Sequence, residues 1–234
     1  MFINEQITCS YLVSATFWPL GLIPCTAGYR HVSKHLLLPL GRLALTVRDV
    51  IRMGHPCLRV PAAPYPTEHL GSAELNKLVY DMRETLHAYG GIGLAAPQID
   101  VGLRIVVIEI ENTSTRYGEI EHTPFEVYIN PSITVIADET AGYWEGCLSV
   151  PGMMGYVERH QHIRVDYLTT AGVDKSIEAH GFLATVFQHE FDHLDGTLYV
   201  DRIKDLSLFS FEEEFAQFHT DVETEAATSS DKID

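Results

Sequence analysis

Two histidines stand four positions apart in the segment Gln-His-Glu-Phe-Asp-His at residues 188–193. On a helix, positions i and i+4 lie one above the other, so His189 and His193 can direct imidazole nitrogens to one metal ion. Glu190 would stand beside that ion, within reach of a bound water. These residues predict metal-assisted hydrolysis, in which the glutamate accepts a proton from water whose pKa the metal lowers to about 7.

A catalytic metal usually has a third protein ligand, and the sequence offers two candidates. A glutamate of the acidic cluster 212–214, downstream of the histidines, would give the arrangement of gluzincin metallopeptidases. Cys147 is the other candidate. It lies in the segment Glu-Gly-Cys-Leu-Ser-Val-Pro-Gly at 145–152, where glycine and proline allow sharp bends that let backbone N–H groups point at a ligand. The residue types alone leave both candidates open.

A glycine-rich segment, Gly-Ile-Gly-Leu-Ala-Ala-Pro-Gln, occupies residues 91–98. It follows a predicted helix and has neither the G-x-G-x-x-G spacing nor the P-loop lysine of nucleotide-binding loops. Its small residues allow a close approach to an extended peptide. Gln98 supplies a neutral N–H donor, which suits a carbonyl oxygen that becomes negative in a tetrahedral intermediate.

The elements that must hold these side chains can be predicted from apolar periodicity. Residues 72–90 carry apolar side chains at spacings of three and four between a serine N-cap and a glycine stop, which is typical of an amphipathic helix. Residues 182–194 show the same spacing. Apolar or alternating runs predict strands at 103–110, 125–129, 133–137, 162–168 and 198–202. The order of helix, strands and helix predicts an α+β fold.

Composition limits the classes of function. The chain has 234 residues, of which 46% are hydrophobic, and this is enough for one sizeable core, which we expect within residues 45–210. A net charge of −16 argues against binding of DNA or of an anionic membrane, because both need clustered positive charge. The four scattered cysteines do not form the pattern of a disulfide framework, which favours reduced thiols in an intracellular compartment.

The N-terminal residues 1–44 are almost free of acidic side chains and are expected to be a disordered extension. Pro19 and Pro24 interrupt their long uncharged run, so no membrane span is expected. Two explanations stay open: an organellar transit peptide, or a start codon assigned too early. We favour the second, which predicts a bacterial cytoplasmic protein; the first would place the protein in a mitochondrion or plastid.

The C-terminal residues 211–234 are predicted to be an acidic tail. From residue 212 onward, eight carboxylates stand against one lysine, and the segment ends in a Ser/Thr/Ala-rich stretch that is typical of disorder.

The three segments 91–98, 145–151 and 188–193 resemble, in order and spacing, the three signature motifs of peptide deformylases. The resemblance covers residues from about 46 to 208 and implies antiparallel strands packed around a central helix that carries the His-Glu-x-x-His motif. It also implies the reaction, which is removal of the formyl group from the N-formylmethionine of nascent polypeptides, with release of formate. An inactive relative that only binds formyl peptides is an alternative that nothing in the sequence favours.

The resemblance also assigns roles to individual residues. Three of them would bind the metal: Cys147, His189 and His193. Glu190 would be the general acid/base, and Gln98 with the backbone N–H of Leu148 would form the oxyanion hole. Gly93 would hydrogen-bond the substrate backbone. One thiolate and two imidazoles suit several divalent ions. The resemblance implies Fe²⁺ as the most common active ion, with Zn²⁺ or another transition metal as alternatives.

Other implied residues lie around this centre. The apolar pocket for the methionine side chain would be lined by Ile92, Tyr143, Phe182, Thr185 and Val186. Glu145 would brace the site, paired with Arg159. Residues 152–155 depart from the commoner family pattern, which has a basic side chain there, so preference beyond formyl-methionine is not predicted. In some members a basic C-terminal helix docks on the ribosome; the acidic residues 212–234 do not favour that mode.

Overall fold

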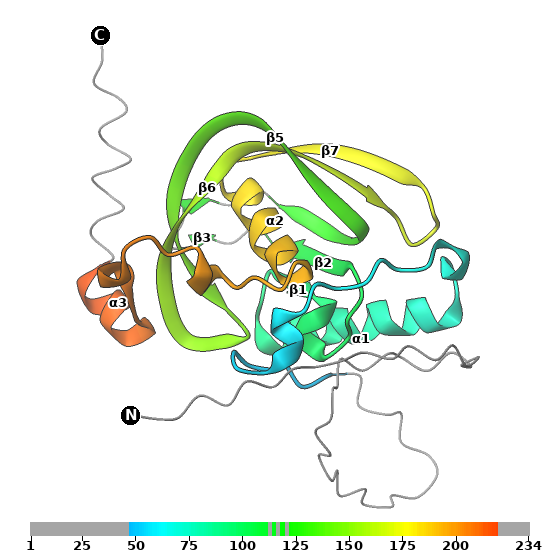
Figure 1. The fold of residues 1–234 in the computed structure, drawn as a ribbon, viewed down its shortest axis with the longest axis horizontal. Coiled ribbons are helices and arrows are strands. Elements are labelled where there is room, and N and C mark those ends of the chain that lie inside the picture. The colour runs from blue at the N-terminus through cyan, green and yellow to red at the C-terminus, as the bar shows by residue number, and fades with distance from the viewer. Residues whose placement is uncertain (1–46, 112–113, 116–117, 120–121, 220–234) are drawn as a thin grey trace, which may run out of the picture.

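The computed structural model describes residues 47–111, 114–115, 118–119 and 122–219 (Figure 1). The expectations for residues 1–44 and for the end of the acidic tail lie outside these residues. The strands pair antiparallel in the order β1-β2-β5-β6-β7, and β8 also pairs with β6. The bounds are β1 Gly93–Ala95, β2 Ile105–Ile110, β5 Thr123–Cys147, β6 Val150–Leu168, β7 Asp174–His180 and β8 Phe209–Phe211. Short strands β3 (Ser114–Thr115) and β4 (Gly118–Glu119) pair with each other.

The long hairpin of β5 and β6 curves around a central helix, α2 (Gly181–Leu194), as Figure 1 shows. Its register runs from Ile129↔Leu168 to Cys147↔Val150 and shifts at several irregular positions. Such shifts bend a strand and increase its twist, which lets the hairpin wrap around the helix. The fold prediction of antiparallel strands around the motif helix is confirmed.

Helix α1 (Ala73–Tyr89) forms as its sequence predicts. The Ser72 hydroxyl accepts a hydrogen bond from the Leu75 N–H at 3.1 Å, and Gly90 ends the helix with a φ of 68° that glycine adopts without strain. The apolar face of α1 packs on one side of β2 and β5, where Ile105 and Val107 are fully buried.

Helix α2 packs on the opposite side of the same strands. Its buried side chains Phe187 and Phe191 belong to one core cluster with Val106 and Ile108 of β2. Because α1 and α2 cover both faces of β2, that strand is apolar at nearly every position, which is why its sequence shows no alternation. Within the described residues, no helix is long and apolar enough to cross a membrane.

Two sequence expectations are corrected near the C-terminus. The strand predicted at 198–202 is wrong, since the chain forms a 3₁₀ helix there, η4 (Tyr199–Asp201). The first part of the predicted tail is ordered: helix α3 (Glu212–Phe218) lies against β6 through the buried Phe215. Four other 3₁₀ helices connect the main elements: η1 Pro56–Arg59, η2 Thr67–His69, η3 Ala96–Ile99 and η5 Leu206–Leu208.

Candidate metal centre and active site

Three side chains that could bind a metal ion meet where the end of β5 approaches α2. The ligand atoms of Cys147, His189 and His193 all lie within 4.8 Å of one another. The Cys147 Sγ is 3.3 Å from the His193 Nε2, and the two imidazole rings are nearly perpendicular, at 77°. A thiolate and two imidazoles in this arrangement fit a divalent transition metal. Cys147 is therefore the third side chain of this cluster, and the exposed glutamates at 212–214 are not part of it. That these three residues bind a metal stays a prediction.

The protonation of the two histidines differs in this centre. Burial lowers the pKa of His193 well below its usual value, and the neighbouring His189 and Arg159 lower it further, so its ring stays neutral and able to bind metal. Burial would also lower the pKa of His189, but its hydrogen bonds to Cys147 and Glu145 raise it well above the usual value. A metal ion and a proton compete for the same lone pair at such a nitrogen.

The carboxylate of Glu145 orients His189. Its Oε2 lies 2.7 Å from the His189 Nδ1, so Nδ1 donates to it and Nε2 keeps the lone pair for a metal. Arg159 donates two hydrogen bonds to Glu145, at 2.8 and 2.9 Å. Burial alone would raise the pKa of Glu145, but these bonds to Arg159 and His189 lower it, which keeps the carboxylate ionised.

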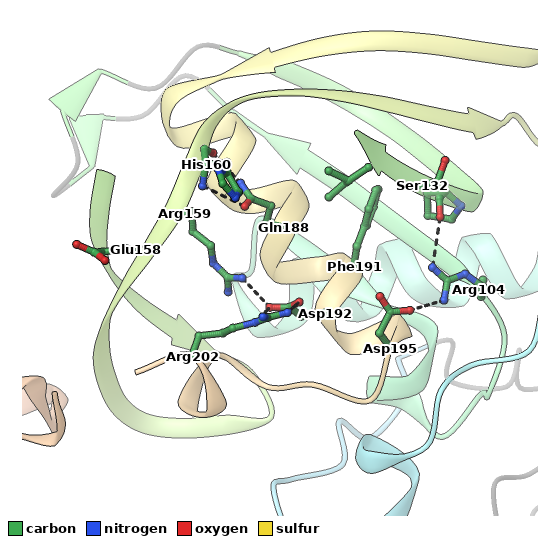
Figure 2. A pocket seen from close by; sticks show the side chains of 12 residues that line it. Arg104, Ser132, Glu158, Arg159, His160, Gln188, Phe191, Asp192, Asp195 and Arg202 are labelled. Carbon is green, nitrogen blue, oxygen red and sulfur yellow. Dashed lines mark hydrogen bonds and ion pairs between the residues drawn. The ribbon is translucent and has the colours of Figure 1, made fainter. Parts of the chain in front are cut away.

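A second carboxylate braces Arg159 from the other side. Asp192 accepts a hydrogen bond from Arg159 at 2.6 Å, and Arg202 donates two more to it (Figure 2). A cavity of about 470 Å³ lies beside this pair. Gln188 and Phe191 of α2 help to line it, as Figure 2 shows. None of the three metal-binding residues lines this cavity, so it lies on a different face of α2 from the metal centre.

Gln98 points its amide group at the metal centre. Its side-chain oxygen accepts a hydrogen bond from the Ala95 N–H at 2.8 Å, which fixes the orientation of the amide. The NH₂ group then donates to the Ser149 hydroxyl at 3.3 Å and lies 3.6 Å from the Cys147 Sγ. Leu148 lies in the tight turn between β5 and β6, next to Cys147. Its role through the backbone N–H stays a prediction.

The Glu190 side chain is buried beside this centre and is only 5% exposed. Within the described part of the chain its Oε2 is buried and has no hydrogen-bond partner. Burial, with a smaller contribution from Glu145, raises its pKa to about 7, although His189 acts in the opposite direction. A Cβ atom added at Gly93 would lie 2.4 Å from the Glu190 Oε1, so only glycine allows this close approach.

The predicted pocket residues fall into two groups. Tyr143 and Phe182 are neighbours, with ring centroids 5.9 Å apart, and Ile92 is 37% exposed ahead of β1. Thr185 and Val186 are buried, and Val186 belongs to the main core cluster. The assignment of these five residues to a methionine pocket stays a prediction.

Sequence reasoning missed three polar partners of the site. Ser149 accepts the Gln98 amide, while Asp192 and Arg202 complete the support of Arg159. Asp192 lies inside the histidine motif, directly before His193. An acidic side chain at that position could have suggested from the sequence that Asp192 supports the site. Arg202 carries no such signal, because its contact with Asp192 depends on the fold of η4.

The fold and the site define a metal-dependent hydrolase centre, built from a helix with two histidines and a hairpin with one cysteine. The family model of polypeptide deformylases matches residues 47–208. Peptide deformylase 2 of Pseudomonas syringae is 46% identical over 165 residues, which are 70% of this chain and 92% of that protein.

Solved structures agree with this match. The class I type b peptide deformylase of Acinetobacter baumannii with bound Met-Ala-Ser is 36% identical, with a TM-score of 0.66 over 68% of this chain and all of that chain. A deformylase of Synechococcus elongatus in complex with actinonin is 33% identical, with a TM-score of 0.61 over 79% of this chain and 93% of that chain. The chain belongs to the peptide deformylase family.

Proposed function

We propose that this protein hydrolyses the formyl amide of N-formylmethionyl nascent peptides and releases formate. The observation that carries the proposal is the convergence of Cys147, His189 and His193 beside a buried Glu190 and an oriented Gln98. A divalent metal held by the cysteine and the two histidines would supply an activated water and polarise the formyl oxygen.

The other residues carry the proton and stabilise charge. Glu190 accepts a proton from the attacking water and later donates it to the departing amine, which suits a carboxyl whose pKa lies near neutrality. The Gln98 NH₂ group and the Leu148 N–H donate hydrogen bonds to the oxygen that becomes negative. Glu145 holds the His189 ring in the orientation that binds metal.

We propose Fe²⁺ as the physiological ion, with Zn²⁺ or another transition metal as an alternative. The donor set supports any of these ions. Metal content of the protein purified without oxygen, compared with turnover after reconstitution by each ion, separates them. Highest turnover with Zn²⁺ would contradict the iron proposal.

We propose a cytoplasmic location and capture of nascent chains without a basic C-terminal docking helix. The bacterial relatives support the location. The first turn of α3 carries three glutamates, and its seven residues include no lysine or arginine, which speaks against docking on ribosomal RNA by this helix.

The test is turnover of formyl-Met-Ala-Ser by the purified chain. We expect formate release by the wild type, with activity and the metal held by His189 and His193 both lost in Cys147→Ser. Cys25→Ser is the matched control and should keep both. A wild-type chain that binds formyl peptides without turnover, when fully loaded with metal, would instead identify a binding protein. Cleavage of unformylated peptides, together with metal still bound by His189 and His193 in Cys147→Ser, would favour the gluzincin alternative.

A further inference from the structure

A second group of metal-binding side chains lies apart from the active site. One ring nitrogen of His55, the Cys57 thiol sulfur and a carboxylate oxygen of Asp100 all lie within 4.8 Å of one another. His55 caps the start of η1, Cys57 lies within η1, and Asp100 ends η3. The two short helices pack together although their sequences are about 40 residues apart, and η1 is the blue segment in Figure 1.

The donor set of this group is that of a zinc-type ion. A thiolate, an imidazole and a carboxylate are all common zinc ligands, and together they leave a fourth position for water. Cys57 is 1% exposed, while His55 and Asp100 are half-buried, so the group lies just beneath the surface. Its three residues are all different from those of the catalytic centre.

An independent observation points to a cation at this place. The Asp100 Oδ1 is buried and, within the described residues, has no hydrogen-bond partner. Burying a carboxylate oxygen without a partner is costly, and native proteins rarely leave one so. A bound cation would compensate that oxygen directly. Among the described residues, no lysine or arginine forms an ion pair with Asp100, and His55, a neighbouring group that could carry a charge, is itself a proposed ligand.

The existing contact of His55 does not prevent binding. Its Nδ1 accepts a hydrogen bond from the Cys57 N–H at 3.3 Å, which is long for such a bond. A metal ion can therefore replace this contact at little cost. The nearby backbone is already held in place, since the Ile51 N–H donates to the Gln98 carbonyl at 2.9 Å.

We propose that His55, Cys57 and Asp100 form a second metal site, for Zn²⁺ or a related transition ion, in addition to the metal centre of the active site. The ion would cross-link the segment around η1 to η3, the short helix that carries Gln98. The site would therefore stabilise η3, which positions Gln98, without contacting the substrate. This inference does not depend on the proposed function.

The first experiment counts thiolate-bound metal by Co²⁺ absorption. In full-length Cys147→Ser, the catalytic thiolate is gone, so a thiolate-to-cobalt charge-transfer band can come only from another cysteine. We expect the band to correspond to one thiolate-bound Co²⁺ ion per chain. A further Cys57→Ser change should abolish it. The matched control adds Cys9→Ser and Cys25→Ser instead and should keep the band. Absence of the band in Cys147→Ser, or its survival after Cys57→Ser, overturns the proposal.

A second variant guards against a folding defect. Asp100 has a φ of 61°, a left-handed conformation that asparagine also tolerates, so Asp100→Asn removes the charge and keeps the backbone. In the Cys147→Ser chain we expect Asp100→Asn to weaken Co²⁺ binding at least tenfold, with an unchanged circular dichroism spectrum. Unchanged affinity overturns the role of Asp100. Formyl-peptide turnover is not measured in either experiment, so their outcome is separate from that of the proposed function.

Discussion

At the scale of single residues, Glu190 can exchange a proton near neutral pH because burial raises its pKa to about 7. We predict that Glu190→Gln keeps its metal and loses at least about 10²-fold in kcat, because an amide cannot accept the proton of water. The measurement is kcat for a formyl peptide with metal content determined on the same sample. Near-normal turnover with full metal content would remove Glu190 from the mechanism.

Gln98 is held in a single orientation by the Ala95 N–H and by Ser149. We predict that Gln98→Leu lowers kcat by about 10²–10³-fold, as expected when one oxyanion donor is lost. Metal binding should change much less, since Gln98 is not a ligand. Ser149→Ala serves as the comparison and should have a smaller effect on kcat, because it removes only a partner of the amide. Equal losses of metal and activity in Gln98→Leu would show that the residue is structural.

The residues of the three motifs could be predicted because each motif is short and its chemistry is local. The family resemblance also implied the pairing of Glu145 with Arg159, but the other supporting contacts could not be predicted. Arg159 joins Glu145 to Asp192, which is 33 positions away from it in the sequence, and Ser149 meets Gln98 across 51 positions. Sequence spacing carries no record of such contacts. Only the packing of the hairpin against α2 brings these partners together.

At the scale of elements, the two main helices follow from their periodicity, whereas the long hairpin does not. The strands predicted at 125–129 and 133–137 are parts of the single strand β5. Much of β5 beyond residue 133 is exposed or half-buried, so its sequence lacks the apolar alternation that marks a strand. Strand β7 was missed for the same reason, since only one of its side chains is buried.

Helix α3 is attached to the sheet mainly through Phe215, which is 2% exposed. The centroid of its ring lies 4.8 Å from that of the Trp144 ring. We predict that Phe215→Ala lowers the free energy of unfolding by about 3 kcal/mol, at the low end for a buried phenylalanine because a short peripheral helix can relax. Phe218→Ala, at a position 65% exposed on the same helix, should change it by less than about 0.5 kcal/mol. Urea unfolding followed by tryptophan fluorescence measures both. Equal effects would contradict the docking of α3 through Phe215.

Glu109 of β2 links the sheet to α1 through Arg83 and His87. Hydrogen bonding to Arg83, despite partial burial, lowers the pKa of Glu109. The resulting stability is present above the usual glutamate value of about 4.3 and is lost as pH falls through the lower folded value. Glu109→Gln should therefore melt below the wild type at pH 7, and the difference should vanish at acidic pH.

Melting curves between pH 7 and pH 3 test this linkage, with Glu68→Gln as the control. Glu68 is exposed in η2, and its change should leave the melting temperature unaltered at each pH. A Glu109→Gln difference that persists unchanged at pH 3 would show that the effect comes from packing and does not depend on charge.

At the scale of the whole molecule, the site depends on two core clusters that lie on opposite faces of β2. Gln98 comes from η3, Cys147 from the end of β5, and the histidines from α2, which are three distant parts of the sequence. The strands between α1 and α2 hold these parts in register, because β2 and β5 pack against both helices. Residues 98–193 contain these groups, but a fragment of that length would lack α1, which covers one face of β2.

The last prediction concerns residues 1–44. The family model begins at residue 47, and the matched part of the chain already spans 92% of the Pseudomonas syringae relative. We therefore expect that a chain starting at Leu45 keeps its melting temperature and its formyl-peptide turnover, because the groups that form the core and the site are all retained. The measurement compares both quantities with those of the full chain, each with its metal content determined. A shortened chain that melts several degrees lower would show that the N-terminal segment packs on the domain, and the predicted boundary at residue 45 would then be wrong.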